Sequence, residues 1–127
     1  MASILAPNMH FAKTGSYSVV EPGKPQEAPA VAPSGGGFVS IASNQQAFAA
    51  LTADGTISVW GHSDSGGSGA PSGSGFVFIA STSFAFAALT SEGTIRAWGH
   101  DGYGGNGAPS GSGFASIAST GSAFAAL

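Results

Sequence analysis

Hydrophobic positions in the larger, C-terminal part of the chain follow a pattern that returns every 38 residues. Residues 37–74 and 75–112 agree at 26 of 38 positions without a gap, and a partial third copy covers 113–127. A fixed spacing of this size is typical of stacked or radially arranged units, none of which buries its apolar faces alone. We therefore predict a repeat protein over 37–127.

Each full repeat contains three short stretches with the composition of β-strands. Phe38–Ala42 is rich in β-formers, and Ala47–Thr52 is apolar without alternation, which indicates a strand covered on both faces. A tight turn is expected at Asp54-Gly55, followed by a third strand at Thr56–Trp60. The equivalent strands of the second repeat are Phe76–Ala80, Ala85–Thr90 and Thr94–Trp98.

These strands predict an all-β fold made of β-propeller-like blades, each with about three to four antiparallel strands. A glycine- and serine-rich segment, 61–75, returns the chain to the next unit. Propellers close with about four to eight blades, so we expect the ring to be incomplete in this chain. We also expect the chain to be part of a longer array, or to be completed by other chains.

Residues 1–36 differ from the repeats, and we predict an extended, proline-rich N-terminal arm there. Its prolines oppose helix formation and favour extended chain; they are Pro7, Pro22, Pro25, Pro29 and Pro33. One short strand is expected at Ser16–Val20, followed by a semi-rigid linker over 21–36. Two interpretations stay open: a disordered tail, or a docking arm whose apolar residues grip another chain.

Charged residues are unusually rare. The chain has three Lys or Arg and six Asp or Glu among 127 residues, a charged fraction of 7% where about a quarter is usual. Such a surface suits a packed assembly or an extracellular fibre, and a neutral, soluble fragment is the alternative. Three basic residues form no stripe for phosphate binding, so we expect no nucleic-acid partner. No apolar run has the length of a membrane span, so no membrane insertion is expected.

The sequence also limits the location and the covalent chemistry of the protein. The N-terminus lacks the charged segment of a signal peptide, which favours a virion component over a secreted adhesin. Cysteine is absent, so disulfides and thiolate metal sites are excluded.

The candidates for metal chemistry are histidines that directly follow Trp-Gly. His62 and His100 occupy the same repeat position, with Asp64 and Asp101 close by in sequence. A metal site between neighbouring repeats lacks a third consistent ligand, so histidines in solvated turns are the favoured interpretation. The glycine-rich segment 66–69 lacks the aspartate of glycine-rich calcium repeats.

Trp60 and Trp98 are the remaining candidates, either for stacking a sugar or for packing between units. Packing is favoured because both residues stand at strand ends in a repeat. No serine lies in a nucleophile elbow, and no glycine-rich loop carries the lysine of a phosphate site. We therefore predict that the protein is not an enzyme and that it has no catalytic, cofactor-binding or metal-binding residues.

The run FVSIASNQQAFAALTADGTISVWG, 38–61, resembles the repeat of the regulator-of-chromosome-condensation family. Matching positions are Val39, Ile41, Ala42, Ala50, Leu51, Asp54, Gly55, Ile57, Trp60 and Gly61, and in the second copy Val77, Ile79, Ala80, Ala88, Leu89, Glu92, Gly93, Ile95, Trp98 and Gly99. The chain is also similar to short Trp-Gly repeats of bacterial and bacteriophage surface proteins. Both resemblances imply a β-propeller-like arrangement of small antiparallel sheets.

The chain departs from that family at several positions. The family's second-strand histidine is replaced by Ala47 or Phe48, depending on register, and the glycine before it by Ser43. The repeat is also shorter than the family's usual blade. The resemblance therefore does not carry over nucleotide exchange or chromatin binding.

Repeats, low charge and a proline-rich arm together predict a structural or adhesive appendage component. A bacteriophage virion fibre or spike, located on the virion or at the extracellular surface, is the leading hypothesis. Its expected partners are other copies of itself, in a trimer, and a virion or cell-surface protein that binds 1–36. The alternatives are a protein-binding propeller module of a longer bacterial protein, and a secreted adhesin or lectin.

Overall fold

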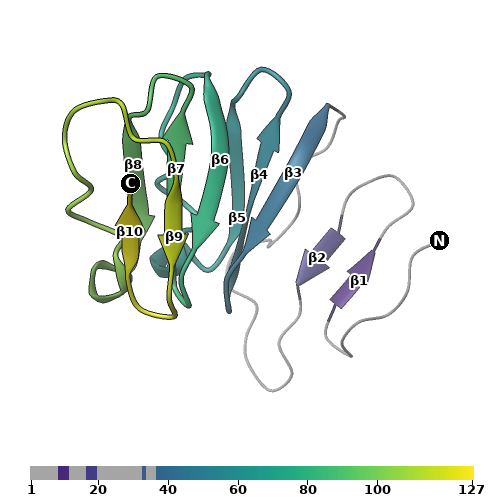
Figure 1. Cartoon of the computed structure of the whole chain (residues 1–127). Helices are drawn as coiled ribbons and strands as arrows, with labels where there is room; N and C mark the ends of the chain where they lie inside the picture. Colours follow the sequence, from purple (N-terminus) through teal and green to yellow (C-terminus); the bar gives the residue numbers. More distant parts are fainter. Residues whose placement is uncertain (1–8, 12–16, 20–32, 34–36) are drawn as a thin grey trace.

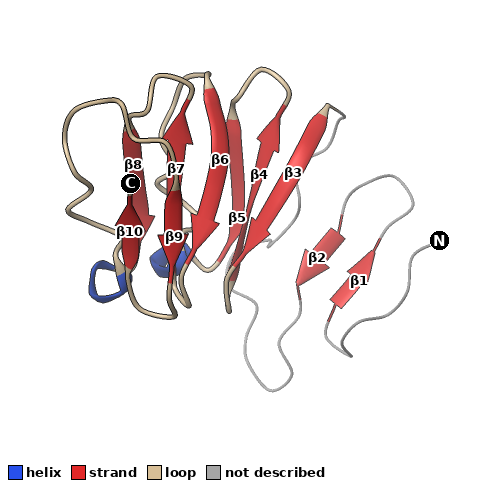
Figure 2. Cartoon of the chain, viewed as in Figure 1, coloured by secondary structure: helices blue, strands red, loops and turns tan. Residues whose placement is uncertain are grey.

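The computed structural model describes residues 9–11, 17–19, 33 and 37–127, and this part of the chain is all-β with almost no helix (Figure 1 and Figure 2). The strands are β1 (Met9–Phe11), β2 (Tyr17–Val19), β3 (Phe38–Ser43), β4 (Ala47–Thr52), β5 (Ile57–Gly61), β6 (Phe76–Ser81), β7 (Ala85–Thr90), β8 (Ile95–Gly99), β9 (Ile117–Ser119) and β10 (Phe124–Ala126). Two short 3-10 turns, η1 (Ser63–Ser65) and η2 (Asp101–Tyr103), follow β5 and β8. No helix in the described residues is long and apolar enough to cross a membrane.

Neighbouring strands form small antiparallel sheets in the order β3-β4-β5, β6-β7-β8 and β9-β10, and β1 pairs with β2. Sequential strands are joined by short turns, which is the connection that antiparallel pairing allows. The predicted strands of both full repeats are confirmed to within one residue at each end. The described sheets do not close into a ring (Figure 1).

The two three-stranded sheets share one pairing scheme. Phe48 lies opposite Trp60 in the first sheet, and Phe86 lies opposite Trp98 in the second. The first strand of each sheet also has an irregularity at the same place, between Phe38 and Ser40 in β3 and at the corresponding residues of β6. The same sequence positions therefore produce the same local structure in both sheets.

The N-terminal segment contains a hairpin, β1–β2. Strand β2 confirms the strand expected at Ser16–Val20, whereas β1 was not predicted. Met9 pairs with Val19 in this hairpin, and 40 residues further on Ala49 pairs with Val59 in the β4–β5 hairpin. The other two pairs of β1 and β2 follow the same offset. The predicted linker, 21–36, lies outside the described residues apart from Pro33.

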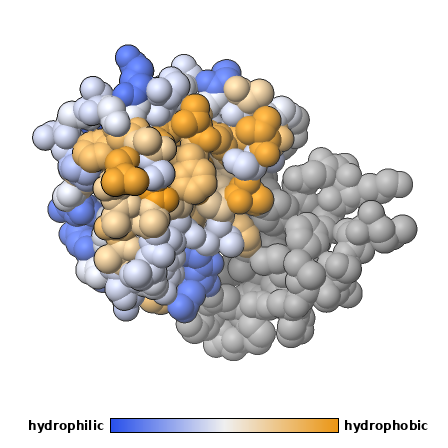
Figure 3. All heavy atoms as spheres, viewed as in Figure 1, coloured by the Kyte–Doolittle hydropathy of each residue, from blue (hydrophilic) through white to orange (hydrophobic). Residues whose placement is uncertain are grey.

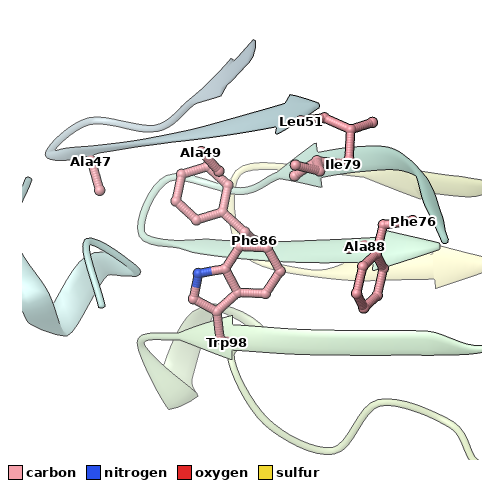
Figure 4. Close-up of a cluster of buried hydrophobic side chains, with 8 residues drawn as sticks. All are labelled: Ala47, Ala49, Leu51, Phe76, Ile79, Phe86, Ala88 and Trp98. Carbon is pink, nitrogen blue, oxygen red and sulfur yellow. The ribbon is translucent and has the colours of Figure 1, made fainter. Parts of the chain in front are cut away.

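The sheet β6-β7-β8 lies between the other two, so β7 is covered on both faces (Figure 1). Residues of β7 from Ala85 to Leu89 are all buried, which confirms the prediction from their unbroken apolar run. Phe86 packs into a cluster with Ala49 of the preceding sheet, and Leu89 packs into a cluster with Ile117 of the following one. The alanines let the sheets approach closely around these larger side chains (Figure 4).

Backbone hydrogen bonds link the sheets at positions 38 residues apart. The N–H of Gln45 donates to the carbonyl of Ser83 at 3.1 Å, and the N–H of Ser83 donates to that of Gly121 at 3.0 Å. The β4–β5 turn makes a further link, because the N–H of Gly75 donates to Asp54 and that of Phe76 to Gly55, both at 3.1 Å. These bonds fix each sheet on its neighbour independently of side-chain type.

Glycine is required at the β4–β5 turn for two reasons. Gly55 has a φ of +85°, and a Cβ there would lie 2.5 Å from the backbone nitrogen of Gly75. The predicted Asp-Gly turn is therefore also the point at which the start of the next repeat contacts the sheet before it.

Candidate functional site

Each Trp-Gly strand end leads into a 3-10 turn capped by a histidine. The Nδ1 atom of His62 accepts a hydrogen bond from the N–H of Asp64 at 3.2 Å, and Nδ1 of His100 accepts from the N–H of Gly102 at 3.1 Å. Because Nδ1 is the acceptor, the proton of the neutral ring belongs on Nε2. The sequence indicated turns at these positions but not this capping role.

The candidate metal ligands are not gathered into one centre. The capping bond already uses Nδ1 of His62 and of His100. No group of three or more His, Asp or Glu side chains with the spacing of a metal site is found in the part of the chain that the structure describes. Asp64 and Asp101 stand in the first turns of η1 and η2, on the exposed side of these loops.

A small polar cluster surrounds the carboxylate of Asp54. It accepts hydrogen bonds from the hydroxyl of Thr52, and from the backbone N–H and hydroxyl of Thr56 at 3.3 and 3.1 Å. The Thr52 bond, followed by the Thr56 bonds, lowers the pKa of the Asp54 carboxyl below its ordinary value of 3.8, since all of them favour the charged form. The cluster sits on an exposed turn and stabilises it.

Trp98 is a packing residue between two sheets, as expected. Its side chain is 4% exposed and stacks on Phe86, with ring centroids 5.4 Å apart. Its Nε1–H donates to the carbonyl oxygen of Gly66 at 3.1 Å, which belongs to the loop after the preceding sheet. Figure 4 shows the Phe86 and Trp98 rings side by side. Trp60 is likewise buried, at 5% exposed, and stacks on Phe48.

The loop after each Trp-Gly has a glycine that receives the following sheet. Gly66 has a φ of +94°, and a Cβ on it would lie 2.6 Å from the ring of Phe86. Gly104 has a φ of +92°, and a Cβ on it would lie 2.7 Å from the ring of Phe124. The two loops therefore present the same backbone shape to the phenylalanine of the next sheet.

A groove with a volume of about 420 Å³ lies between β8 and β10. Its lining comes from β7, β8, the loop after η2 and β10, and includes Ala87, Ile95, Ala97, Gly104, Ala108 and Phe124. A second groove of about 520 Å³ adjoins it along β8, where Thr94 and Arg96 add polar groups. The first groove is mostly apolar and carries no charged side chain, so it suits an uncharged, apolar ligand.

Large apolar side chains are also exposed on β3 and β6. They are Phe38, Val39, Ile41, Val77 and Phe78, with exposed fractions between 37% and 62%. Figure 3 shows apolar side chains gathered on the face that carries these strands. The sequence did not predict this surface, because the same strand pattern is buried wherever a further sheet covers it: Ile79 is 9% exposed, and its equivalent Ile41 is 55% exposed.

The site features of this chain are thus a set of sheet-to-sheet contacts, an exposed apolar strip and an apolar groove. Comparison of the sequence with protein-family models and with curated proteins returned no match in either case.

Proposed function

We propose that this protein is a structural, adhesive component of an appendage, such as a bacteriophage virion fibre or spike. The observation that carries the proposal is the exposed apolar strip on β3 and β6, in a chain with a charged fraction of only 7%. Val39 and Val77 are 62% and 55% exposed, and few charges surround them to oppose contact with another molecule. A surface of this kind favours permanent assembly.

The proposed architecture is a row of β-propeller-like blades similar to the Trp-Gly repeats described above. Its support is the shared pairing scheme of the sheets and the backbone links between Gln45, Ser83 and Gly121. Repeats that contact only their neighbours lengthen an array without changing its cross-section, which is what a projecting fibre needs.

The proposed partners are other copies of the chain, in a trimer, and a virion or cell-surface protein that binds residues 1–36. The location that follows is the virion or the extracellular surface. The exposed strip supports the contact between copies, because apolar area removed from water contributes about 25 cal/mol per Å².

Light scattering on the intact chain over a range of concentrations tests this function. We expect a trimer for the wild type and dissociation for the Val39→Lys/Val77→Lys variant, which places two charges in the strip. Ser40→Lys is the matched control, because it adds a charge to an exposed polar position of the same strand. A wild-type chain that stays monomeric at every concentration contradicts the proposal.

A second candidate function is a protein-binding module of a longer bacterial protein. The apolar groove beside β10 favours it, since such grooves accept side chains of a partner. A monomeric chain that binds a peptide in this groove would select this candidate over the first.

A further inference from the structure

The groove beside β10 repeats a site that is occupied elsewhere in the same molecule. Between the first two sheets, Trp98 fills the corresponding space, where it packs with Ala49 and donates a hydrogen bond to Gly66. The indole stacks on Phe86 from its own sheet. This filled site shows which side chain and which backbone contacts the geometry accepts.

The lining of the two sites corresponds residue by residue at a distance of 38. The filled site is surrounded by Ala49, Ile57, Val59, Gly66, Ala70 and Phe86. The groove is lined by Ala87, Ile95, Ala97, Gly104, Ala108 and Phe124. Gly66 and Gly104 also agree in backbone conformation, with φ and ψ of 94° and 8° against 92° and 10°. The acceptor carbonyl is therefore presented in the same way in both sites.

The two sites differ in what covers them. Phe86 and Ala88 are both 0% exposed under Trp98 and its strand. Their equivalents are more accessible, since Phe124 is partly exposed and Ala126 is exposed. The floor of the second site is thus built to the same pattern, and within the described residues no indole lies over it.

The edge of β10 beside the groove also matches an edge that is paired in the second sheet. There, β8 runs antiparallel to β7, with Trp98 opposite Phe86 and Ile95 opposite Leu89. Within the described residues, β10 pairs with β9 alone, and its equivalent of Leu89 is Leu127, which is 86% exposed. An open strand edge of this kind accepts a further strand by backbone pairing.

We propose that the groove and the β10 edge bind an extended segment of another polypeptide with the sequence type Thr-Ile-x-x-Trp-Gly. The segment pairs antiparallel with β10, its isoleucine covers Leu127, and its indole stacks on Phe124. The indole N–H donates to the carbonyl oxygen of Gly104. Backbone pairing supplies much of the affinity, and the indole in its pocket supplies the specificity.

The partner is a different polypeptide, because the Trp-Gly strands of this chain are already used. Strands β5 and β8 are each paired within their own sheets, so a second copy has no free strand of this type among its described residues. The proposal does not depend on the appendage role, since its test measures peptide binding and the test of that role measures oligomeric state.

NMR titration of the ¹⁵N-labelled, full-length chain tests the proposal. The probe is a synthetic peptide with the sequence of 92–100, EGTIRAWGH. We expect saturable shifts at the amides of Gly104 and of Phe124 to Leu127. A peptide with alanine in place of tryptophan should bind at least about tenfold more weakly, because the indole is the anchor.

Two protein variants of the same kind provide the matched control. Phe124→Ala removes the ring under the indole and should weaken peptide binding about tenfold or more, as expected for loss of an anchor contact. Phe78→Ala removes a phenylalanine that is 46% exposed on β6 and should leave the affinity unchanged. Retained amide dispersion in both spectra establishes that the variants are folded.

Three results would overturn the proposal. One is the absence of shifts at millimolar peptide, and another is equal affinity of the tryptophan and alanine peptides. The third is an oligomer of the chain that excludes the peptide and dissociates in the Phe124→Ala variant, which would assign the groove to a second copy.

Discussion

The indole Nε1–H of Trp98 donates a hydrogen bond to the carbonyl oxygen of Gly66, 3.1 Å away and 32 residues earlier in the chain. The bond joins the last strand of one sheet to the loop that leaves the sheet before it. It is buried, so the carbonyl has no water to replace a lost donor.

Trp98→Phe removes this donor and keeps an aromatic ring on Phe86. We expect a loss of about 1–3 kcal/mol in the free energy of unfolding, because a buried carbonyl is left without its partner. Urea denaturation of both proteins measures the difference. Unchanged stability would show that the Gly66 carbonyl finds another donor.

Gly66→Ala and Gly69→Ala separate backbone strain from steric overlap. Both glycines have positive φ, +94° and +81°, so alanine costs about 1–2 kcal/mol at each from the left-handed conformation. A Cβ at Gly66 would also meet the Phe86 ring at 2.6 Å, whereas nothing lies within 4 Å of one at Gly69. We expect the Gly66 variant to lose a further 1–3 kcal/mol or about that amount, as overpacked sites do. Equal losses in thermal denaturation would contradict the close packing at Gly66.

The two repeats solve one contact in two different ways. Ser65 Oγ donates to Gln46 Oε1 at 2.7 Å in the first repeat, and Phe84 packs edge-on against Tyr103 at 4.8 Å in the second. Each pair lies at the same two repeat positions. The polar or aromatic character of one position therefore determines that of the other.

A double-mutant cycle on Phe84→Gln and Tyr103→Ser tests this coupling. Each single variant leaves a mismatched pair, and the double variant recreates the hydrogen-bonded pair of the first repeat. We expect a coupling of about 0.5–1.5 kcal/mol, the value of an aromatic pair beyond its buried area. Additive losses would show that the two positions are independent.

Acid should weaken the contribution of Asp54 to stability. The folded-state pKa of its carboxyl is lowered by bonds from Thr52 and Thr56, so the unfolded chain takes up this proton more readily. The stabilisation is therefore present above the ordinary value of 3.8 and is lost as the pH falls through the folded-state pKa. The difference in Tm between wild type and Asp54→Asn should narrow from pH 6 to pH 2.5. A constant difference would contradict the carboxylate's role.

Strand positions in the repeats were predictable because their limits are set locally. Glycine at 55 and 93 ends one strand and starts the next, and β-branched and aromatic residues fill the strands between. The covering of β7 on both faces also followed from its unbroken apolar run. These features depend on neighbours within a few residues.

Other features depend on contacts between distant residues and were missed. Strand β1 has no strong strand pattern, and only its pairing with β2 shows that it follows the scheme of β4 and β5. The histidine caps had a visible pattern, since His62 and His100 each precede a left-handed glycine by four residues. The groove beside β10 had none, because it depends on which strands happen to lie over Phe124.

The hydrogen bonds from Gln45 to Ser83 and from Ser83 to Gly121 bear on how a gene for such a protein changes in length. Each bond joins equivalent positions, so an in-frame duplication of one whole repeat brings a copy whose donors and acceptors already match both neighbours. An insertion of any other length inside a sheet breaks the match on both sides. Recombination between copies is thus filtered by hydrogen bonding, and whole repeats are the units that are gained or lost.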